Sequence, residues 1–251
     1  MIVVEQLAKR FGNVQALHEV SFIARDGRIT GLLGANGAGK STTLRIVSTV
    51  LHADSGGAIV DGRNCKQETL AVRRSLGVLP HASGLYPHLT ARENIRYYGQ
   101  LHGLETGIIE QRIDRWSRQL EMSEILDRRT QGFSHGQKLK VALARALIHA
   151  PRNVILDEPT SGLDVHATRA LREVIRGLKE SGCCVLFSSH IMQEVAALCD
   201  DIVIIAHGRV VAGGTPEEIL ANTGASNLED AFMRATGEPA AVEQSQGEAV
   251  V

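Results

Sequence analysis

The run Gly34-Ala35-Asn36-Gly37-Ala38-Gly39-Lys40-Ser41 most constrains the fold of this chain, because it lies between a strand-like segment and a helix-like one. Ile29 to Leu33 is short, apolar and followed by glycine, whereas Thr42 to Leu51 has a helical pattern. Glycines let the backbone come close to an anion, so successive N–H groups can face phosphate oxygens at the positive end of a helix. The run therefore predicts a phosphate-binding loop.

The side chains of this loop predict two further contacts. Lys40 adds a full positive charge near the outer phosphates, and the Ser41 hydroxyl is placed to bind Mg²⁺. A glycine-rich turn in an unrelated α/β protein is the alternative interpretation of the octamer alone. The predicted binding residues are Gly34, Asn36, Gly37, Ala38, Gly39, Lys40, Ser41 and Thr42.

The composition indicates one globular domain. With 251 residues, 43% of them hydrophobic, the chain can bury a sizeable core and accommodate an inserted lobe. The formal net charge is −1 and the charges are interspersed, so we expect no nucleic-acid partner. The cysteines form no C-x-x-C pair, which fits a reducing cytoplasm. No window approaches about 18 uninterrupted apolar residues, so we do not expect the chain itself to span a membrane.

Short apolar strands scattered among helical patterns predict a layered α/β core. Several early strands lie too close together for crossover helices. We therefore expect an antiparallel β portion near the N-terminus, joined to a more parallel sheet that carries the phosphate loop. The expected strands are Ile2–Val4, Val20–Ile23, Ile29–Leu33, Ile59–Val60, Leu76–Leu79, Val154–Leu156, Val185–Ser188, Ile202–Ile205 and Arg209–Ala212.

An almost continuous helical pattern predicts a helical subdomain inserted into the core at about 84–150. We expect the main domain to span 1–224 and a C-terminal helix to follow at 225–236. The tail at 237–251 is rich in Glu, Gln, Ala and Gly, which predicts disorder. The expected helices of the inserted stretch are Thr90–Leu101, Ile108–Leu120, Ser123–Arg128 and Gly136–Ala150.

A second motif is Val154-Ile155-Leu156-Asp157-Glu158, where an apolar strand ends in two carboxylates. Asp157 is suited to hold Mg²⁺ through water, and Glu158 to orient or deprotonate the water that attacks a γ-phosphate. Alone, the pattern is more typical of a strand that meets a solvated acidic turn. Together with the phosphate loop, it favours nucleotide hydrolysis.

Five motifs together resemble the ATP-binding-cassette (ABC) ATPases over about residues 1–220. They are Gly34–Ser41, Ser134-His135-Gly136-Gln137, Val154–Glu158, Ser161-Gly162-Leu163-Asp164 and His190, in that family's order and spacing. The resemblance implies a P-loop NTPase core, ATP and Mg²⁺ as ligands, and a head-to-tail homodimer or pseudo-dimer around two ATP molecules. It further implies a bacterial or archaeal export subunit, at the cytoplasmic face of the membrane beside a transmembrane permease.

The resemblance also assigns catalytic roles at the matching positions. Lys40, Glu158 and His190 would act on the γ-phosphate and the attacking water, with the His190 imidazole donating to phosphate or holding Glu158 in register. Asp164 would lie in the loop that reaches across the dimer. Without the family, His190 is an ordinary surface or core histidine, and Asp164 is a helix N-cap.

Ser134, Gly136 and Gln137 would, by the same resemblance, bind the ATP held by the other subunit. They begin a helix whose N–H groups and dipole favour an anion. Taken as an isolated segment, they form an ordinary N-cap. The family usually has glycine where His135 stands, although that position varies.

Phe11 matches the aromatic residue that stacks on adenine in the family, and Val14 and Ala16 would line the same pocket. In isolation, Phe11 is more typical of a core position. The main departure is His81, because the family usually has glutamine there, in contact with Mg²⁺ or water. We expect His81 to keep a communicating catalytic role with a pH-sensitive contribution, because an imidazole titrates near neutrality.

The helical subdomain is where the family docks its membrane partner. Tyr86, Leu89, Tyr97 and Tyr98 are candidates to line a groove for a short helix of the permease, although such spacing is more often core. The stretch Leu89–Ile95 resembles sodium-efflux ATPase subunits. A soluble regulatory ABC ATPase that acts on translation or DNA, without a transporter, is the alternative. A GTPase is disfavoured because no Asn-Lys-x-Asp motif is present.

Overall fold

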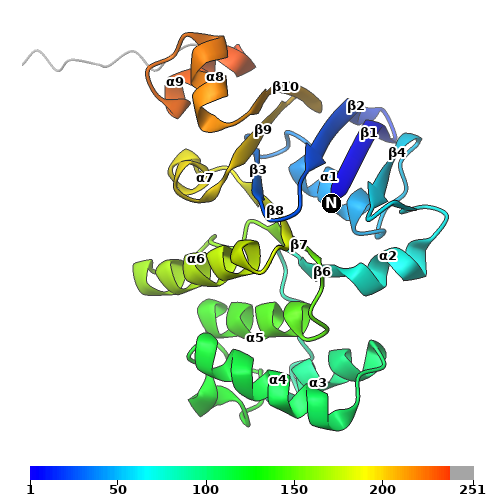
Figure 1. Cartoon of the computed structure of the whole chain (residues 1–251), viewed down its shortest axis with the longest axis vertical. Helices are drawn as coiled ribbons and strands as arrows, with labels where there is room; N and C mark the ends of the chain where they lie inside the picture. Colours follow the sequence, from blue (N-terminus) through cyan, green and yellow to red (C-terminus); the bar gives the residue numbers. More distant parts are fainter. Residues whose placement is uncertain (238–251) are drawn as a thin grey trace, which may run out of the picture.

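The computed structural model describes residues 1–237, and the tail expected to be disordered lies outside this range from residue 238 on. Two sheets and a helical layer build the described part (Figure 1). The larger sheet has the strand order β10-β9-β3-β8-β7-β6, and its neighbours from β9 to β6 pair in parallel. Its strands are β3 (Ile29–Leu33), β6 (Leu76–Leu79), β7 (Asn153–Asp157), β8 (Cys184–Ser189), β9 (Asp201–Ala206) and β10 (Arg209–Gly214).

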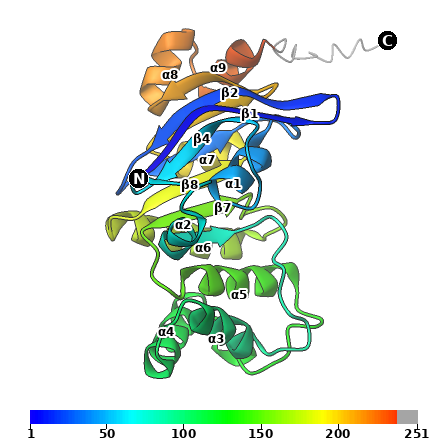
Figure 2. The ribbon, with the colours of Figure 1, turned by 90° about the vertical axis from the view of Figure 1, so that its right-hand side faces the viewer.

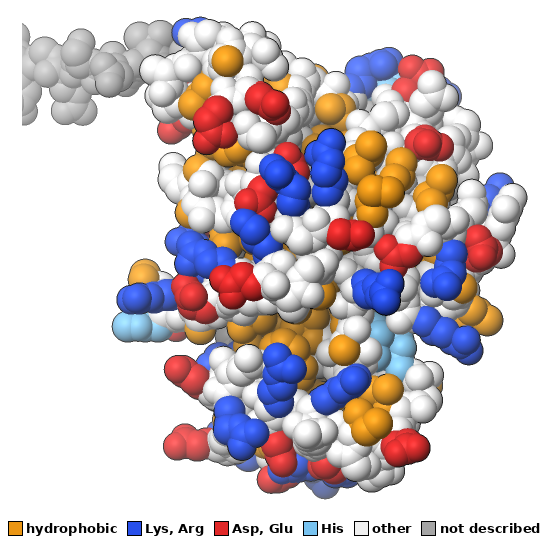
Figure 3. Space-filling view, in the orientation of Figure 1, with side chains coloured by type: hydrophobic (Ala, Val, Ile, Leu, Met, Phe, Trp, Pro, Cys, Tyr) orange, Lys and Arg blue, Asp and Glu red, His pale blue; other side chains and the backbone are white. Residues whose placement is uncertain are grey.

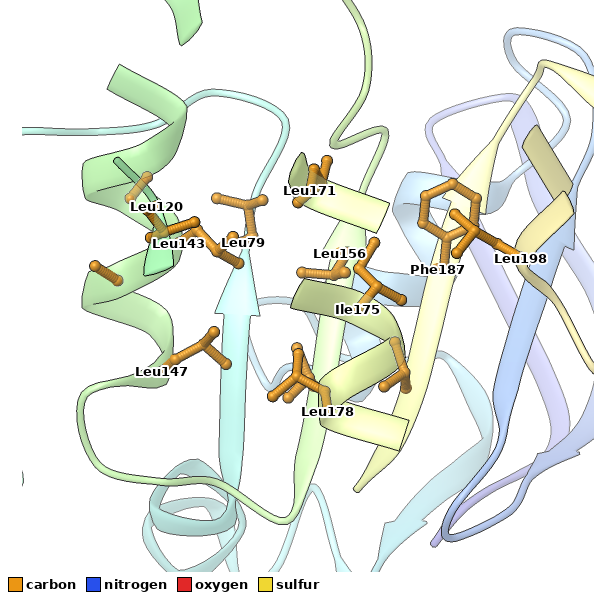
Figure 4. Close-up of a cluster of buried hydrophobic side chains, with 14 of the residues drawn as sticks. Leu79, Leu120, Leu143, Leu147, Leu156, Leu171, Ile175, Leu178, Phe187 and Leu198 are labelled. Atoms are coloured by element: carbon orange, nitrogen blue, oxygen red, sulfur yellow. The ribbon is translucent and has the colours of Figure 1, made fainter. Parts of the chain in front are cut away.

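The parallel strands read as continuous apolar runs because both faces of the sheet are covered. In β7, Val154 and Leu156 face one hydrophobic core while Ile155 faces the other. The first core contains residues of α5 (His135–Leu147), α6 (Val165–Glu180) and α7 (Met192–Leu198), and Figure 4 shows part of it. The second core joins α1 (Lys40–Val47) and the smaller sheet.

The smaller sheet is antiparallel and has the order β2-β1-β4-β5, as expected near the N-terminus. Its strands are β1 (Ile2–Phe11), β2 (Val14–Ala24), β4 (Ser55–Val60) and β5 (Arg63–Asn64). The expected strands Ile2–Val4 and Val20–Ile23 are shorter than β1 and β2, in which they lie. Register shifts interrupt the pairing between Val4 and Arg10, and Gln6 and Glu19 have positive φ, so the alternation that marks a strand is broken in the sequence.

The helical layer lies beyond the parallel sheet and consists of α3 (Ala91–Leu101), α4 (Thr106–Gln119), a short 3-10 turn and α5 (Figure 2). A capping box begins α3, where Thr90 accepts from the Glu93 N–H and the Glu93 carboxylate accepts from the Thr90 N–H. The expected helix Ser123–Arg128 is wrong beyond Ile125. The carbonyls of Leu126 and Arg128 accept from the first amides of α3, so these residues do not continue a helix.

Several short elements were not predicted. They are β5, α2 (Thr69–Ser75), α7 and α8 (Pro216–Thr223), each of them at most eight residues long. The helix expected at 225–236 begins at Leu228 as α9 (Leu228–Thr236), because Asn227 caps it. Among residues 1–237, no helix is both long and apolar enough to cross a bilayer.

Candidate functional site

The loop Gly34–Ser41 joins the end of β3 to the start of α1, in the predicted strand-to-helix context. Gly39 is the N-cap of α1 with a φ of 111°, and a Cβ there would lie 2.6 Å from Leu17 Cδ2. Gly37 also has positive φ, but a Cβ there would meet nothing within 4 Å. Gly39 thus lets the loop pack on β2, whereas Gly37 leaves backbone open to a ligand.

Lys40 is buried, at 4% exposure, and its ammonium group is held inside the loop. Its Nζ donates to the carbonyl oxygens of Gly34 at 2.7 Å and Ala35 at 3.1 Å. The same Nζ lies 3.3 Å from Glu158 Oε1. The structure therefore brings the predicted lysine and the predicted base together at the carboxyl ends of β3 and β7.

Asp157 and Ser41 lie side by side next to this pair. The Ser41 hydroxyl donates to Asp157 Oδ1 at 3.2 Å, and the Ser188 hydroxyl donates to the same oxygen at 2.7 Å. Asp157 is buried at the end of β7, which pairs with β8 through Asp157 and Ser188. These hydroxyl and carboxylate oxygens are hard donors of the kind that Mg²⁺ prefers.

Glu158 has a strained backbone and a fixed side chain. Its φ is +49°, the left-handed region that non-glycine residues seldom adopt. Its N–H lies 3.0 Å from Ser188 Oγ, and its Oε2 lies 3.1 Å from His190 Nδ1. Strain of this kind costs on the order of 1–3 kcal/mol and is concentrated at functional sites.

Sequence reasoning did not identify two groups that support this arrangement. Ser188 contacts both acidic residues, as described above. Behind it, the buried Glu194 carboxylate accepts from Thr160 Oγ1 at 2.5 Å and from Ser189 Oγ at 3.0 Å, and Ser189 Oγ also accepts from the Ile191 N–H. Two serines at the end of an otherwise apolar strand, just before His190, were the available signal.

The start of α5 lies against the Ser161–Asp164 loop of the same chain. Ser134 and Gln137 form a capping box, and no hydrogen bond or ion pair joins them to the phosphate loop within residues 1–237. A Cβ on Gly136 would lie 3.7 Å from Leu163 Cδ2. The predicted binding residues Ser134, Gly136 and Gln137 therefore sit beside the Ser161–Asp164 loop, apart from the Lys40 cluster.

The remaining predicted residues differ in their surroundings. Ala16 lies beside the phosphate loop, since its carbonyl oxygen is 3.0 Å from a Cβ built on Gly39. Phe11, at 48% exposure, pairs with Val14 at the exposed end of the β1-β2 hairpin and is not a core residue. His81 is exposed after β6, and none of the described side chains forms a hydrogen bond with it. Asp164 caps α6 by accepting from the Ala167 N–H at 2.8 Å.

A separate groove of about 870 Å³ lies between α4 and α6, where Figure 3 shows hydrophobic side chains between α6 and the helical layer. Trp116, Leu147, Val174 and Leu178 are among its apolar lining residues. None of the site residues predicted from the sequence lines this groove. It is therefore distinct from the phosphate site.

Comparisons with known proteins identify the family to which the chain belongs. A family model described as ABC transporter matches residues 17–161. The ABC transporter ATP-binding protein NatA of Bacillus subtilis (strain 168) is 40% identical over 238 residues, which cover 93% of this chain and 97% of that relative. The chain belongs to the ABC transporter ATP-binding family. The assignment made from the five sequence motifs is confirmed.

Two further comparisons extend the likeness of this ABC ATPase. The linearmycin resistance ATP-binding protein LnrL of Bacillus subtilis (strain 168) is 35% identical over 228 residues, 91% of this chain and 73% of that relative. A solved structure of an ATP binding subunit of an ABC transporter has a TM-score of 0.88 at 30% identity, and the match covers 94% of this chain and 99% of that one. The chain is thus an ATP-binding, ATP-hydrolysing subunit of the export type, with the P-loop NTPase fold predicted for it.

Proposed function

We propose that two copies of this ABC ATPase close around ATP and that closure and hydrolysis drive an export permease. The observation that carries the proposal is the division of the predicted site within one chain. Lys40 and Glu158 lie in one cluster, whereas Ser134 and Gly136 lie beside the Ser161–Asp164 loop. Residues from a second copy would complete the site over the γ-phosphate.

Lys40 is the residue whose contacts change when ATP binds. Two of its three ammonium protons are directed at loop carbonyls, and Glu158 is the remaining partner. A γ-phosphate oxygen competes with Glu158 for Lys40, so the carboxylate becomes free to accept a proton from the attacking water. His190 keeps that carboxylate oriented through its contact with Oε2.

Ser41 and Asp157 are the residues that would hold Mg²⁺. The second oxygen of Asp157 accepts no hydrogen bond from residues 1–237, so it remains available. Mg²⁺ commonly takes one or two protein ligands and fills its other positions with water and substrate phosphates. When bound, the ion would neutralise charge on the β- and γ-phosphates. The backbone amides of Asn36, Gly37, Ala38 and Gly39, with the Thr42 hydroxyl, would bind the remaining phosphate oxygens, and Phe11 would stack on adenine.

Opening of the dimer follows from loss of a shared contact. The γ-phosphate is bound by Lys40 of one copy and by the Ser134 helix start of the other. Hydrolysis breaks that bridge and leaves negative charges to be separated. The energy available for movement is therefore released at the interface between the copies.

The export partner is a membrane-spanning permease that binds the helical layer. Exposed aromatic side chains support this surface, because Tyr86 and Tyr97 are 45% and 40% exposed and their rings are in edge contact. Such a partner would hold the ATPase at the cytoplasmic face of the membrane. The resemblance of Leu89–Ile95 to sodium-efflux subunits supports Na⁺ as cargo, and the name of the relative LnrL supports export of a toxic compound as the competing cargo.

The test first asks whether a neighbouring gene encodes a polytopic membrane protein. That protein is then co-expressed with the chain, and inverted vesicles are prepared. We expect ATP-dependent uptake of radioactive sodium, which is lost in the Glu158→Gln variant. Drug and lipid substrates are measured in parallel, and uptake of these alone would replace sodium as the cargo. ATP turnover with no bound membrane protein, together with binding to ribosomes or DNA, would favour the regulatory alternative.

A further inference from the structure

Arg145 is a buried cation that the proposed mechanism does not use. It lies in α5, is 5% exposed, and has no carboxylate within 4 Å among residues 1–237. Its Nη1 donates to the Gly84 carbonyl at 2.8 Å and its Nη2 donates to the Ser83 carbonyl at 2.5 Å. The guanidinium carbon lies 4.5 Å from the centre of the Tyr98 ring.

An arginine in this position is costly. A buried charge loses its hydration, and here two carbonyl dipoles and one aromatic face replace it. The same burial lowers the pKa of the Arg145 guanidinium. An apolar residue of similar length would fill the space without that cost. What only arginine supplies is a planar fork that binds two successive carbonyls at once.

The two carbonyls belong to the loop that follows β6 and carries His81. Other residues fix the second half of this loop, since Asn94 bonds to both the N–H and the carbonyl of Tyr86 and Thr130 donates to the same carbonyl. The first half, at Ser83 and Gly84, is held by Arg145. Figure 2 shows α5 lying between strand β7 of the larger sheet and the outer helices α3 and α4.

Arg145 therefore connects helix α5, which begins after Ser134, to the loop at Ser83 and Gly84. It lies 11 residues from Ser134 on α5, about 16 Å along the helix axis at 1.5 Å per residue. A rotation or shift of the Ser134 end moves Arg145 as part of a rigid rod, and the fork transmits that motion to the loop between His81 and Tyr86. Tyr86 is part of this loop, and its exposed ring is in edge contact with the exposed ring of Tyr97.

We propose that Arg145 is a positioning residue that couples the ATP-contacting end of α5 to the His81 loop and to the exposed tyrosine surface beyond it. The coupling to ATP rests on the proposed function. The claim that Arg145 fixes Ser83 and Gly84 does not depend on that function.

The first experiment measures amide hydrogen exchange in the peptide that contains Ser83 and Gly84. Arg145→Met removes both donors at similar length, and Arg145→Lys keeps the charge but cannot bind both carbonyls. We expect exchange in this peptide to rise roughly tenfold in Arg145→Met and less in Arg145→Lys, since two charge-assisted bonds are lost. Arg112→Met is the matched control, because Arg112 donates to the Ile148 carbonyl at 2.8 Å and does not contact the loop.

The second experiment tests the coupling with purified full-length protein. In the wild type, ATP should change exchange in this peptide, and in Arg145→Met that ATP-dependent change should be absent. ATPase turnover should fall about tenfold with little change in KM, because Arg145 does not touch the nucleotide. Arg112→Met should keep both parameters within about twofold.

Two results would overturn the inference. One is an unchanged exchange rate at Ser83 and Gly84 in Arg145→Met, and the other is a retained ATP-dependent change in that variant. If Arg145→Met does not fold, Arg145→Lys is judged by the same criteria. Absence of ATP turnover in the wild type would instead reject the proposed function, while the exchange rate without nucleotide would still decide whether Arg145 holds the loop.

Discussion

Glu158 is held at both oxygens and at its backbone. Lys40 lies beside Oε1, His190 beside Oε2, and Ser188 beside the N–H. A side chain with this many constraints loses little further entropy when it must hold a water molecule in one orientation. Glu158 combines these contacts with a left-handed φ, a kind of backbone strain that is concentrated at functional sites.

Glu158→Gln tests the assignment of the general base. The amide keeps the shape but cannot accept the proton, so we expect turnover to fall by about 10²–10⁴. ATP affinity, measured by equilibrium binding, should change little because Lys40 and the loop are intact. Near-normal turnover would assign the base to another residue.

A second residue-scale feature is the stacked pair His102 and His149, whose parallel rings are 3.7 Å apart. His149 Nε2 lies 3.0 Å from the Leu76 carbonyl, so this nitrogen carries the proton in the neutral ring. Burial, with lesser contributions from His102 and Arg112, lowers the pKa of His149 to about 4. Burial and then Arg74 lower the pKa of His102. The folded protein therefore prefers neutral rings at this junction of α3, α5 and β6.

This preference predicts acid-sensitive stability. The unfolded chain binds a proton at His149 near its ordinary pKa of 6.5, whereas the folded chain does so only near 4. Stability is then fully present above pH 6.5 and declines as pH falls towards 4, by about 2–3 kcal/mol at pH 4.5. The free energy of unfolding is measured with urea at pH 6.5 and at pH 4.5. His149→Gln should make the loss of this free energy between the two pH values smaller by that amount. His88→Gln, at an exposed histidine, is the control, and an equal reduction in both variants would refute the assignment.

At the scale of elements, two helix starts in this chain coincide with site residues predicted from the sequence. Asp164 caps α6, and the family resemblance also places it in the loop that reaches the second copy. Ser134 likewise caps α5, and the family resemblance assigns it to the ATP of the second copy. A cap fixes where a helix begins, so it also fixes where the loop before the helix presents its groups.

Substitutions at Asp164 separate the two roles. Asp164→Ala loses the cap and should cost about 1 kcal/mol, a fall in Tm of roughly 2–4 °C in a domain of this size. Asp164→Asn keeps the accepting oxygen but removes the charge. We expect this variant to retain the wild-type Tm within about 1 °C and to lose turnover. Wild-type turnover in Asp164→Asn would restrict Asp164 to capping.

The elements that were predictable from sequence are those with a strong local signal. The helix after Ser134 and the one after Asp164 begin at residues whose side chains cap them, and the buried strands β3 and β6 are apolar and bounded by other elements. The long hairpin of β1 and β2 was underestimated because its bulges disrupt the alternation of side chains. The short helices α2 and α7 depend on packing against β5 and β3, which no local pattern reports.

At the scale of the whole molecule, the motifs predicted that a phosphate loop and an acidic strand end would meet, and Lys40, Asp157 and Glu158 do lie together. The two serines before His190 mark a polar strand end, but that Ser188 contacts both Asp157 and Glu158 depends on the parallel register of β7 and β8. Nor could the sequence place His81, which lies in the loop that Arg145 holds at Ser83 and Gly84. Contacts between distant strands and loops decide these positions.

A mixing experiment tests whether the site is shared between copies. Lys40→Ala and Gly136→Asp should each abolish turnover, because each removes a different half of both sites in a homodimer. In an equimolar mixture, half of the dimers contain one intact site, so we expect roughly a quarter of wild-type activity if the sites act independently. Lys40→Ala mixed with Glu158→Gln is the control and should stay inactive, since both residues lie in the same half-site. If the mixture of Lys40→Ala and Gly136→Asp remains inactive, the model of two composite sites that act independently is wrong.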